Sequence, residues 1–219
     1  MVMRLILLLM TSLLFANPCD KNNLYLDARI NPTLREVMQI ALEEYQVPIA
    51  YSYKVMKCLP NVVAKSSPSK KTTHHQQFVT QERIKKGIDY YQQQKILSTL
   101  DLDVEGSVLI SIMNIETNLG RFTGKHHTLT SLANIVAETR PMYQHRLYDY
   151  MKTQLVALLT LGYRDYVDLE VLKGSWDGGI GIPQFMPSTY LSYVKDKNIK
   201  PDLFSHTDAI LGINHYLIA

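Results

Sequence analysis

The sequence predicts a mainly α-helical protein, in which a short helical N-terminal segment precedes one compact helical domain. The first observation is that, from Phe78 onward, apolar residues recur at three- and four-residue spacing in one stretch after another, as in amphipathic helices. The second is that no alternating apolar–polar stretch of useful length and no internal repeat occurs, so an extensive sheet is not expected. The third is AKSSPSKKTTHHQQ at 64–77, whose lack of apolar periodicity indicates a linker.

The predicted helices follow one another along the chain. In the N-terminal segment, residues 31–47 form a helix that Pro48 ends, and its apolar face consists of Leu34, Val37, Met38, Ala41, Leu42 and Tyr45. The later helices are predicted at 80–98, 105–119, 127–138, 143–161, 187–195 and 206–217. We therefore assign residues 17–75 to the N-terminal segment with its linker and residues 76–219 to the domain.

Length and composition are those of an ordinary globular protein. The 219 residues suffice for one sizeable domain with an appendage, and 46% of them are hydrophobic and 20% charged. The formal net charge is +3 and the pI about 8.7, but lysines and arginines are scattered along the chain. Because nucleic-acid binding requires a basic stripe, we expect no nucleic-acid partner, and a solvated exterior explains the mild basicity.

The first residues, MVMRLILLLMTSLLFANP, indicate export. Arg4 gives a positive start, residues 5–15 form an apolar stretch too short to span a bilayer, and Ala16 is a small residue before a turn. We predict a signal peptide at 1–16 and a periplasmic location. Nothing later is long and apolar enough to span, so the mature protein is expected to be soluble or peripheral. The alternative is a buried helix at the true N-terminus.

The chain has two cysteines, Cys19 and Cys58. In an oxidising compartment they favour one disulfide. Alternatively, Cys19 could carry a lipid after signal cleavage, although Pro18 before it does not suit that processing.

One carboxylate, Glu116, interrupts the apolar segment SVLISIMNIETNLGRF at 107–122. On a helix, Leu109 and Met113 share the face of Glu116. Glu116 is therefore predicted to lie on the apolar side of the helix. The roughly opposite face carries Ser111, Asn114 and Asn118.

Burial on that side should raise the pKa of Glu116 and keep it protonated near neutral pH. A protonated carboxyl is what a general acid needs in order to donate a proton to a glycosidic oxygen. The same residues also allow a glutamate that reaches solvent at the helix end marked by Gly120, or that pairs with Arg121.

The stretch KGSWDGGIGIPQFMPSTY at 173–190 combines glycine turns with polar and aromatic groups. Its glycines allow the backbone to approach a ligand closely. Hydrogen-bonding groups and flat apolar surfaces together are typical of a sugar site. The alternative is a structural loop. The polar groups are Ser175, Gln184, Ser188 and Tyr190, and the stacking groups are Trp176 and Phe185.

Other site types are not supported. No Lys-Ser/Thr pair follows the glycines as in a phosphate loop, and Lys173 occupies a position where a serine-hydrolase elbow needs glycine. DLDVEG at 101–106 resembles the start of a calcium loop, but its twelfth position is Ile112. The pairs His74-His75 and His126-His127 lack partners at ligand spacing. We expect no metal and no cofactor.

Three stretches together resemble the lytic murein transglycosylases, and most closely the membrane-bound lytic transglycosylase B family. They are ISIMNIETNLGRFTGKHHTLTSLA, LKGSWDGGIGIPQFMPSTYLSYV and HTDAILGINHYL. The resemblance spans about residues 76–219, because FVTQERIKKGIDYY also resembles that family's lead-in helix. It implies a lysozyme-like, mainly helical catalytic domain that acts on peptidoglycan glycan strands.

The resemblance also implies a mechanism. Glu116 matches the family's catalytic acid, which cleaves the MurNAc–GlcNAc β-1,4 bond without water and leaves a 1,6-anhydro end. Such a reaction needs only one carboxylate, because the attacking hydroxyl belongs to the substrate. Residues that match the family's substrate-binding positions are Ser175, Gln184, Phe185, Met186 and Tyr216.

The chain departs from the family pattern at three places. Asp177-Gly178-Gly179 replaces a usual Ala-Gly-Ala; Asp177 is expected to point outward or cap a turn, or alternatively to hold a water near the site. VKDKNIKPDLF at 194–204 replaces an acidic calcium loop of some relatives. Asn214-His215-Tyr216 replaces Ala-Asn-Tyr, which puts an asparagine role in doubt.

Two other functions stay open at this point, a water-using muramidase and a non-catalytic peptidoglycan-binding protein. We expect a monomer, with peripheral association with the membrane or with cell-wall machinery left open.

Overall fold

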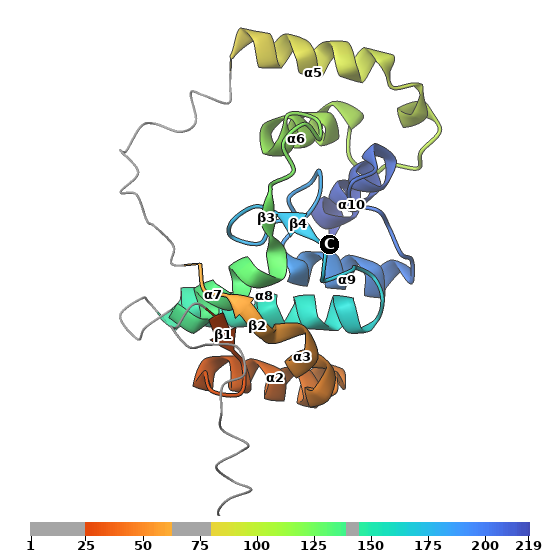
Figure 1. Ribbon diagram of the computed structural model, residues 1–219. Coiled ribbons are helices and arrows are strands. Elements are labelled where there is room, and N and C mark those ends of the chain that lie inside the picture. The colour runs from red at the N-terminus through yellow and green to blue at the C-terminus, as the bar shows by residue number, and fades with distance from the viewer. Residues whose placement is uncertain (1–24, 63–79, 139–144) are drawn as a thin grey trace, which may run out of the picture.

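The computed structural model describes residues 25–62, 80–138 and 145–219 (Figure 1). In these ranges the chain forms eight α-helices and four short strands, which pair into two separate two-stranded ribbons. The predicted mainly α-helical architecture is confirmed. The predicted signal peptide at 1–16 and the predicted linker at 64–77 lie outside the described residues. None of the helices in the described ranges is both long and apolar enough to cross a bilayer.

The N-terminal segment contains more structure than the sequence predicted. Its elements are β1 (Tyr25–Asp27), α2 (Pro32–Tyr45), α3 (Ile49–Met56) and β2 (Lys57–Pro60), and β1 pairs antiparallel with β2. The predicted helix at 31–47 corresponds to α2. Asn31 caps it, because its side chain accepts the backbone N–H groups of Thr33 and Leu34, both at 3.0 Å. α2 ends at Tyr45, two residues before the predicted end, because Gln46 is left-handed with a φ of 60° and caps the helix; Pro48 instead lies at the N-cap of α3, which follows directly.

The N-terminal segment packs against the later helices. α2 buries Leu34, Val37, Met38 and Ala41, and it contacts α7 (Thr128–Glu138) and α8 (His145–Tyr163). Polar contacts join the same surfaces: the Tyr148 hydroxyl donates to Thr33 at 3.1 Å, and Lys152 pairs with Glu36 at 2.8 Å. The domain boundary near residue 75 stays a prediction.

In the later part of the chain, α8 packs against α7 and α9 (Pro187–Lys197). The other elements of this part are α5 (Gln81–Gln93), a 3-10 turn η1 (Lys95–Ser98), α6 (Gly106–Thr117), β3 (His126–His127), β4 (Lys173–Gly174) and α10 (His206–Ile218). Leu155, Leu158 and Leu159 on α8 are fully buried. The helix α8 itself packs against α2 and against α9 (Figure 1).

Two of the predicted helices include residues that belong to other elements in the structure. The predicted helix at 80–98 is α5 followed by η1, with a break at Gln94. The predicted helix at 127–138 begins at Thr128, because His126 and His127 form β3, which pairs with Gly174 and Lys173 of β4. A two-residue strand is too short to produce an alternating pattern, so its pairing could be found only in the tertiary structure.

α6 lies between α5 and α10 at the opposite end of the molecule from α2 (Figure 1). It buries Leu109, Ile110 and Met113, whereas α5 buries no residue and forms an outer layer. This arrangement leaves the C-terminal end of α6 next to the β3–β4 ribbon, because only residues 118–125 separate the two elements.

Cys58 is disulfide-bonded. Cys19, the other cysteine of the sequence, lies outside the described residues.

Candidate active site

Glu116 occupies the last turn of α6, and the backbone after it turns sharply. Asn118 and Leu119 adopt left-handed conformations with φ of 54° and 60°, and Gly120 follows with φ of 83°. The N–H of Asn118 donates to the carbonyl of Asn114 at 3.0 Å and closes the helix. The adjacent Thr117 is buried, and its hydroxyl donates to the carbonyl of Ile182 at 2.9 Å. Glu116 is thereby held against the loop that contains Ile182.

The predicted position of Glu116 on the helix needs correction. The buried face of α6 carries Leu109, Ile110, Met113, Asn114 and Thr117, and Glu116 is exposed at its edge. Asn114, which the helical pattern placed on the polar side, is buried against α5, where its Nδ2 donates to the carbonyl of Arg83 at 2.8 Å. The pattern missed this contact because α5 covers α6 with polar as well as apolar groups.

The pKa of Glu116 is nevertheless raised, in the predicted direction. Desolvation by the surrounding protein is the larger cause, and the negative charge of Asp177 adds to it. Glu116 is thus exposed to solvent yet flanked closely enough by protein to disfavour its charged form. The alternative pairing with Arg121 is not formed among the described residues; the Arg121 guanidinium lies 5.1 Å from the ring centroid of Phe122.

Ser175 is held within a tight turn after β4. Its hydroxyl donates to Oδ1 of Asp177 at 2.5 Å and accepts the backbone N–H of Gly179 at 2.7 Å. A Cβ on Gly179 would lie 2.8 Å from the Ser175 oxygen and 3.0 Å from Oε1 of Gln184. Glycine at this position therefore lets the side chains of Ser175 and Gln184 approach the same point of the backbone.

Gln184 connects that turn to the loop after α6. Its Nε2 donates to the carbonyl of Gly181 at 2.8 Å and to the carbonyl of Thr123 at 3.2 Å. Nearby, a Cβ on Gly124 would lie 2.0 Å from the backbone of Gly174, and Gly124 has a φ of 98°. Only glycine permits this crossing, which places the chain that follows Glu116 directly against the turn that holds Ser175.

The remaining predicted site residues lie at one end of α9 and on α10. Phe185 is buried, with its ring centroid 5.7 Å from that of Tyr216, which is 57% exposed. Phe185 therefore supports Tyr216 from below, which differs from the stacking surface that the sequence predicted. Met186 is half-buried at the N-cap of α9.

Tyr150 of α8 is a candidate site residue that the sequence did not predict, and Asp177 has a larger effect on the site than the sequence predicted. Burial raises the pKa of Tyr150, and the charges of Asp177 and then Tyr216 raise it further, so the three side chains are neighbours. Asp177 accepts a hydrogen bond within its turn, as predicted, but its charge also acts on Glu116. No local signal marks Tyr150, because only the packing of α8 brings it to this surface.

Glu116, the Ser175–Gln184 turn, Tyr150 and Tyr216 thus form one polar and aromatic surface from four separate segments. The model of the protein family described as "Transglycosylase SLT domain" matches residues 34–219, which include all four. The chain belongs to the transglycosylase SLT family.

Individual family members support the same assignment. The chain is 28% identical to membrane-bound lytic murein transglycosylase B of Escherichia coli K12 over 151 aligned residues. The aligned residues make up 67% of this chain and 40% of that protein. The chain resembles the structure of the E. coli lytic transglycosylase SLT35 in complex with bulgecin A, with a TM-score of 0.69 and 21% identity over 90% of this chain and 66% of that one. For SltB1 of Pseudomonas aeruginosa the TM-score is 0.69, with 24% identity over 84% of this chain and 64% of that one.

The structural similarity to SLT35 and SltB1 shows that this chain has the lysozyme-like fold of these lytic transglycosylases. The chain spans less than two thirds of the length of these relatives, and about two fifths of the E. coli transglycosylase B.

One relative, SLT35, has also been solved in complex with calcium. In this chain, charged side chains of the stretch 194–204 and its neighbours bond to other groups of the protein. Lys200 pairs with Asp165 at 3.1 Å, and Oδ2 of Asp208 accepts the N–H of Asp202 at 2.7 Å. No cluster of three or more potential metal-ligating His, Cys, Asp or Glu side chains occurs within the described ranges.

Asn214 and His215 have structural contacts. Oδ1 of Asn214 accepts the backbone N–H groups of Asp103 and Val104, at 3.0 and 2.9 Å. These two hydrogen bonds hold the DLDVEG stretch, which leads into α6, against α10. His215 bonds to Asp196 at 3.1 Å.

Proposed function

We propose that this protein is a peptidoglycan lytic transglycosylase that cleaves the MurNAc–GlcNAc β-1,4 bond, with Glu116 as the catalytic acid. The observation that carries the proposal is the raised pKa of Glu116 beside the hydrogen-bonded Ser175–Gln184 turn. A carboxyl group whose pKa is raised stays protonated closer to neutral pH, and it can then donate its proton to the leaving glycosidic oxygen.

The reaction proceeds without an external nucleophile. Glu116 protonates the glycosidic oxygen as the bond from C1 to that oxygen breaks. The resulting carboxylate then takes the proton of the muramic acid C6 hydroxyl, whose oxygen bonds to C1 and closes the 1,6-anhydro ring. Because both reacting groups belong to one sugar, their proximity gives a large effective concentration, and a single carboxylate returns to its starting state.

The other site residues hold the glycan. The exposed ring of Tyr216 offers a flat apolar face for a sugar, and the buried ring of Phe185 packs against it. We assign the half-buried Met186, which follows Phe185 in the chain, to the same surface. Ser175 and Gln184 present neutral oxygen atoms from a turn that is fixed by its own hydrogen bonds, because the Ser175 hydroxyl already donates to Asp177 and Nε2 of Gln184 already donates to two backbone carbonyls. Such a rigid polar group costs little ordering entropy when substrate binds.

The relatives support this substrate class. The E. coli relative is named a membrane-bound lytic murein transglycosylase. SltB3 of P. aeruginosa, with a TM-score of 0.56 to this chain, has been solved in complex with NAG-anhNAM-pentapeptide. We place this protein in the periplasm, in keeping with the signal peptide that its sequence predicts, where it would meet glycan strands as a soluble or peripheral protein.

Digestion of purified murein sacculi tests the proposal. The wild-type protein should release muropeptides that mass spectrometry identifies as 1,6-anhydro species. Glu116→Gln keeps the shape of the side chain but cannot donate an acidic proton, so release should fall by about 10²- to 10⁴-fold. Equal release by the variant would refute the role of Glu116. Sacculus binding without any release by the wild type would instead indicate the non-catalytic binding function.

A second candidate function, hydrolysis by water, is favoured by one observation. Asp177 lies close enough to Glu116 for its charge to raise the pKa of that acid. A second carboxylate near a catalytic acid can accept a proton from water as the water attacks C1. In that case the products would carry reducing MurNAc ends in place of anhydro ends, and Asp177→Ala would abolish them. Wholly anhydro products that are unchanged in Asp177→Ala exclude this second function.

A further inference from the structure

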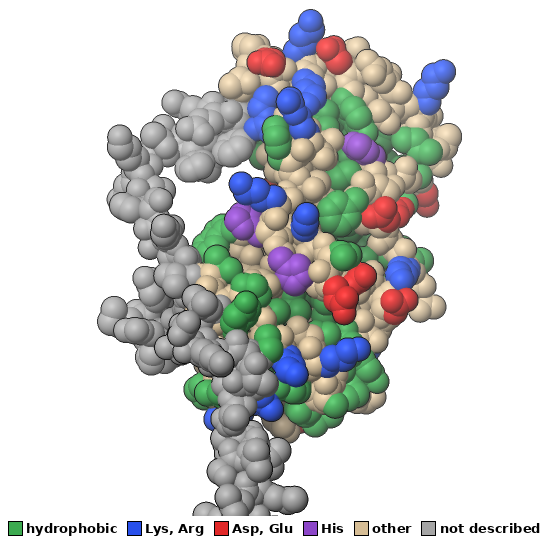
Figure 2. All heavy atoms as spheres, in the orientation of Figure 1, with side chains coloured by type: hydrophobic (Ala, Val, Ile, Leu, Met, Phe, Trp, Pro, Cys, Tyr) green, Lys and Arg blue, Asp and Glu red, His purple; other side chains and the backbone are tan. Residues whose placement is uncertain are grey.

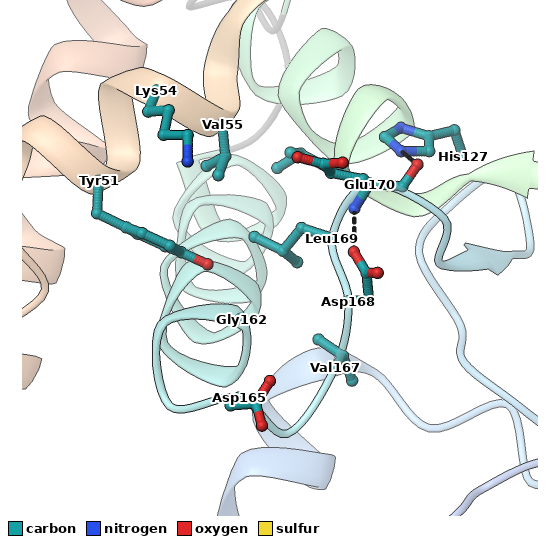
Figure 3. Close-up of a pocket in the computed structure, with 11 residues that line it drawn as sticks. Tyr51, Lys54, Val55, His127, Gly162, Asp165, Val167, Asp168, Leu169 and Glu170 are labelled. Atoms are coloured by element: carbon teal, nitrogen blue, oxygen red, sulfur yellow. Dashed lines mark hydrogen bonds between the residues drawn. The ribbon is translucent and has the colours of Figure 1, made fainter.

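A cavity of about 450 Å³ lies between α3 and the loop that follows α8 (Figure 3). Its lining residues include none of those in the candidate active site. Apolar side chains form part of its wall, and two of them, Leu129 and Leu169, are buried. The volume lies within the range of about 300–1,000 Å³ that is usual for small-molecule sites.

Opposite charges face this cavity from its two sides without pairing. Lys54 and Tyr51 project from α3, and Glu170 reaches toward them from the facing loop (Figure 3). Neither the Lys54 ammonium nor the Glu170 carboxylate forms an ion pair with any residue in the described ranges, although both are close to the same space. Lys54 and Glu170 thus remain free to bind a ligand.

The other polar groups of the cavity are already engaged. Asp165 pairs with Lys200 at 3.1 Å, and Oδ1 of Asp168 accepts the N–H of Glu170 at 2.9 Å. Both ring nitrogens of His127 have partners, Oγ1 of Thr130 at 2.7 Å and the carbonyl of Glu170 at 3.1 Å. These contacts fix the loop, so the carboxylate of Glu170 is presented from a backbone that is held at two points.

Tyr51 adds a hydrogen-bond donor to this wall. Burial raises the pKa of its hydroxyl, and the charges of Asp168 and Asp165 raise it further. The hydroxyl therefore keeps its proton at all ordinary pH values. Its ring packs edge-on against Tyr163, with 5.2 Å between the ring centroids, which limits its movement.

We propose that this cavity binds a small zwitterion, an amino acid or the end of a peptide that carries both an ammonium and a carboxylate group. Glu170 accepts hydrogen bonds from the ammonium, while Lys54 donates to the carboxylate. Charge-assisted hydrogen bonds of both kinds are stronger than neutral ones. The flexible four-carbon stem of Lys54 adapts to the length of the ligand, and the apolar wall covers its carbon chain.

The zwitterion has two possible sources, a free amino acid or the stem peptide of murein, and the second source rests on the proposed function. The cavity adjoins the candidate active site through the β3–β4 ribbon. His127 in its wall pairs with Lys173, and Ser175 follows two residues later. At about 3.3 Å per residue, the chain from Lys173 to Ser175 spans on the order of 7 Å.

Calorimetric titration of the full chain tests the proposal. The probes are free meso-diaminopimelic acid and a disaccharide peptide whose stem ends in that residue. Each is compared with one counterpart in which every amino group is acetylated and one in which every carboxylate is a methyl ester. The unmodified probes should bind, and loss of either charge should weaken binding by about tenfold or more. Binding of the free amino acid alone assigns the first source, and tighter binding of the disaccharide peptide assigns the second.

Variants locate the binding in this cavity. Glu170→Gln and Lys54→Gln should each weaken binding of the unmodified probes by about tenfold or more, whereas Glu44→Gln and Lys57→Gln, at exposed positions outside the cavity, should bind as the wild type does. No binding by the wild type, equal binding by all variants, or equal binding of the counterparts that keep charges of only one sign overturns the proposal. Glu116→Gln should bind normally, so failure of the proposed function would be seen separately, as unaltered sacculus digestion by that variant.

Discussion

At the scale of single residues, Glu116 has a raised pKa because of two different neighbours. Desolvation by the protein around it acts at any pH at which the fold persists, whereas the contribution of Asp177 requires that Asp177 be ionised. Asp177 also accepts the hydrogen bond that the Ser175 hydroxyl donates, so this hydroxyl proton is not available to a substrate. The departure from the family's small residues at this position therefore affects both the acid and the turn that binds the substrate.

Asp177→Asn should change the pH dependence of sacculus digestion. Removal of a nearby negative charge lowers the pKa of Glu116, so the protonated acid is lost at a lower pH as pH rises. The alkaline limb of the pH–rate profile should therefore move toward acid. Asp89→Asn, at an exposed position on α5, serves as the control and should leave the profile in place. An alkaline limb that stays in place in Asp177→Asn would contradict this account.

At the scale of elements, the position of α6 depends on contacts at both of its ends. Its C-terminal end is fixed by the Thr117 hydroxyl on Ile182 and by the glycine crossing at Gly124. Its entry is fixed from α10, where Asn214 accepts two backbone N–H groups. The two helices that carry Glu116 and Tyr216 are thus joined by a buried amide side chain.

Asn214→Ala should lower the free energy of unfolding by about 1–3 kcal/mol, because it leaves the N–H groups of Asp103 and Val104 without their acceptor. Asn214→Asp keeps an oxygen at the same place and should be less destabilising. Denaturant unfolding measures both variants. An equal loss in the two would show that the accepting oxygen is not what stabilises this junction.

At the scale of the whole molecule, the N-terminal segment shares its core with α7 and α8. The fully buried Leu34 of α2 belongs to this core. The segment also supplies one wall of the cavity between α3 and the loop after α8. A destabilising substitution in α2 should therefore also lower the stability of the candidate active site, because the two share one core.

Leu34→Ala tests this coupling. Removing the buried side chain should cost about 2–5 kcal/mol of stability. The single tryptophan of the sequence, Trp176, lies in the turn of the candidate site, so its fluorescence reports unfolding there. The transition seen by Trp176 should shift in Leu34→Ala and much less in Leu42→Ala, whose side chain is 38% exposed. An unshifted Trp176 transition would mean that α2 unfolds independently.

The sequence by itself determined the helical class, the approximate helix positions and the identity of most candidate site residues. Helical periodicity is a local property, and the Ser175–Gln184 turn with its glycines is continuous along the chain. The family resemblance joined these features to Glu116. Helix ends such as those shortly before Pro48 and Gly120 also depend on local backbone chemistry, and the predicted ends therefore lie within two residues of the observed ones, Tyr45 and Thr117.

Only the tertiary structure decided how these parts meet. It placed Glu116 at the edge of the buried face, because α5 covers the side of α6 that the pattern had assigned to solvent. It brought Asp177 to the acid and Tyr150 to Asp177 and Tyr216, and it put Lys54 opposite Glu170. These neighbours come from elements far apart in the chain, and the pKa of a carboxyl depends on distances in space, which helical spacing does not contain.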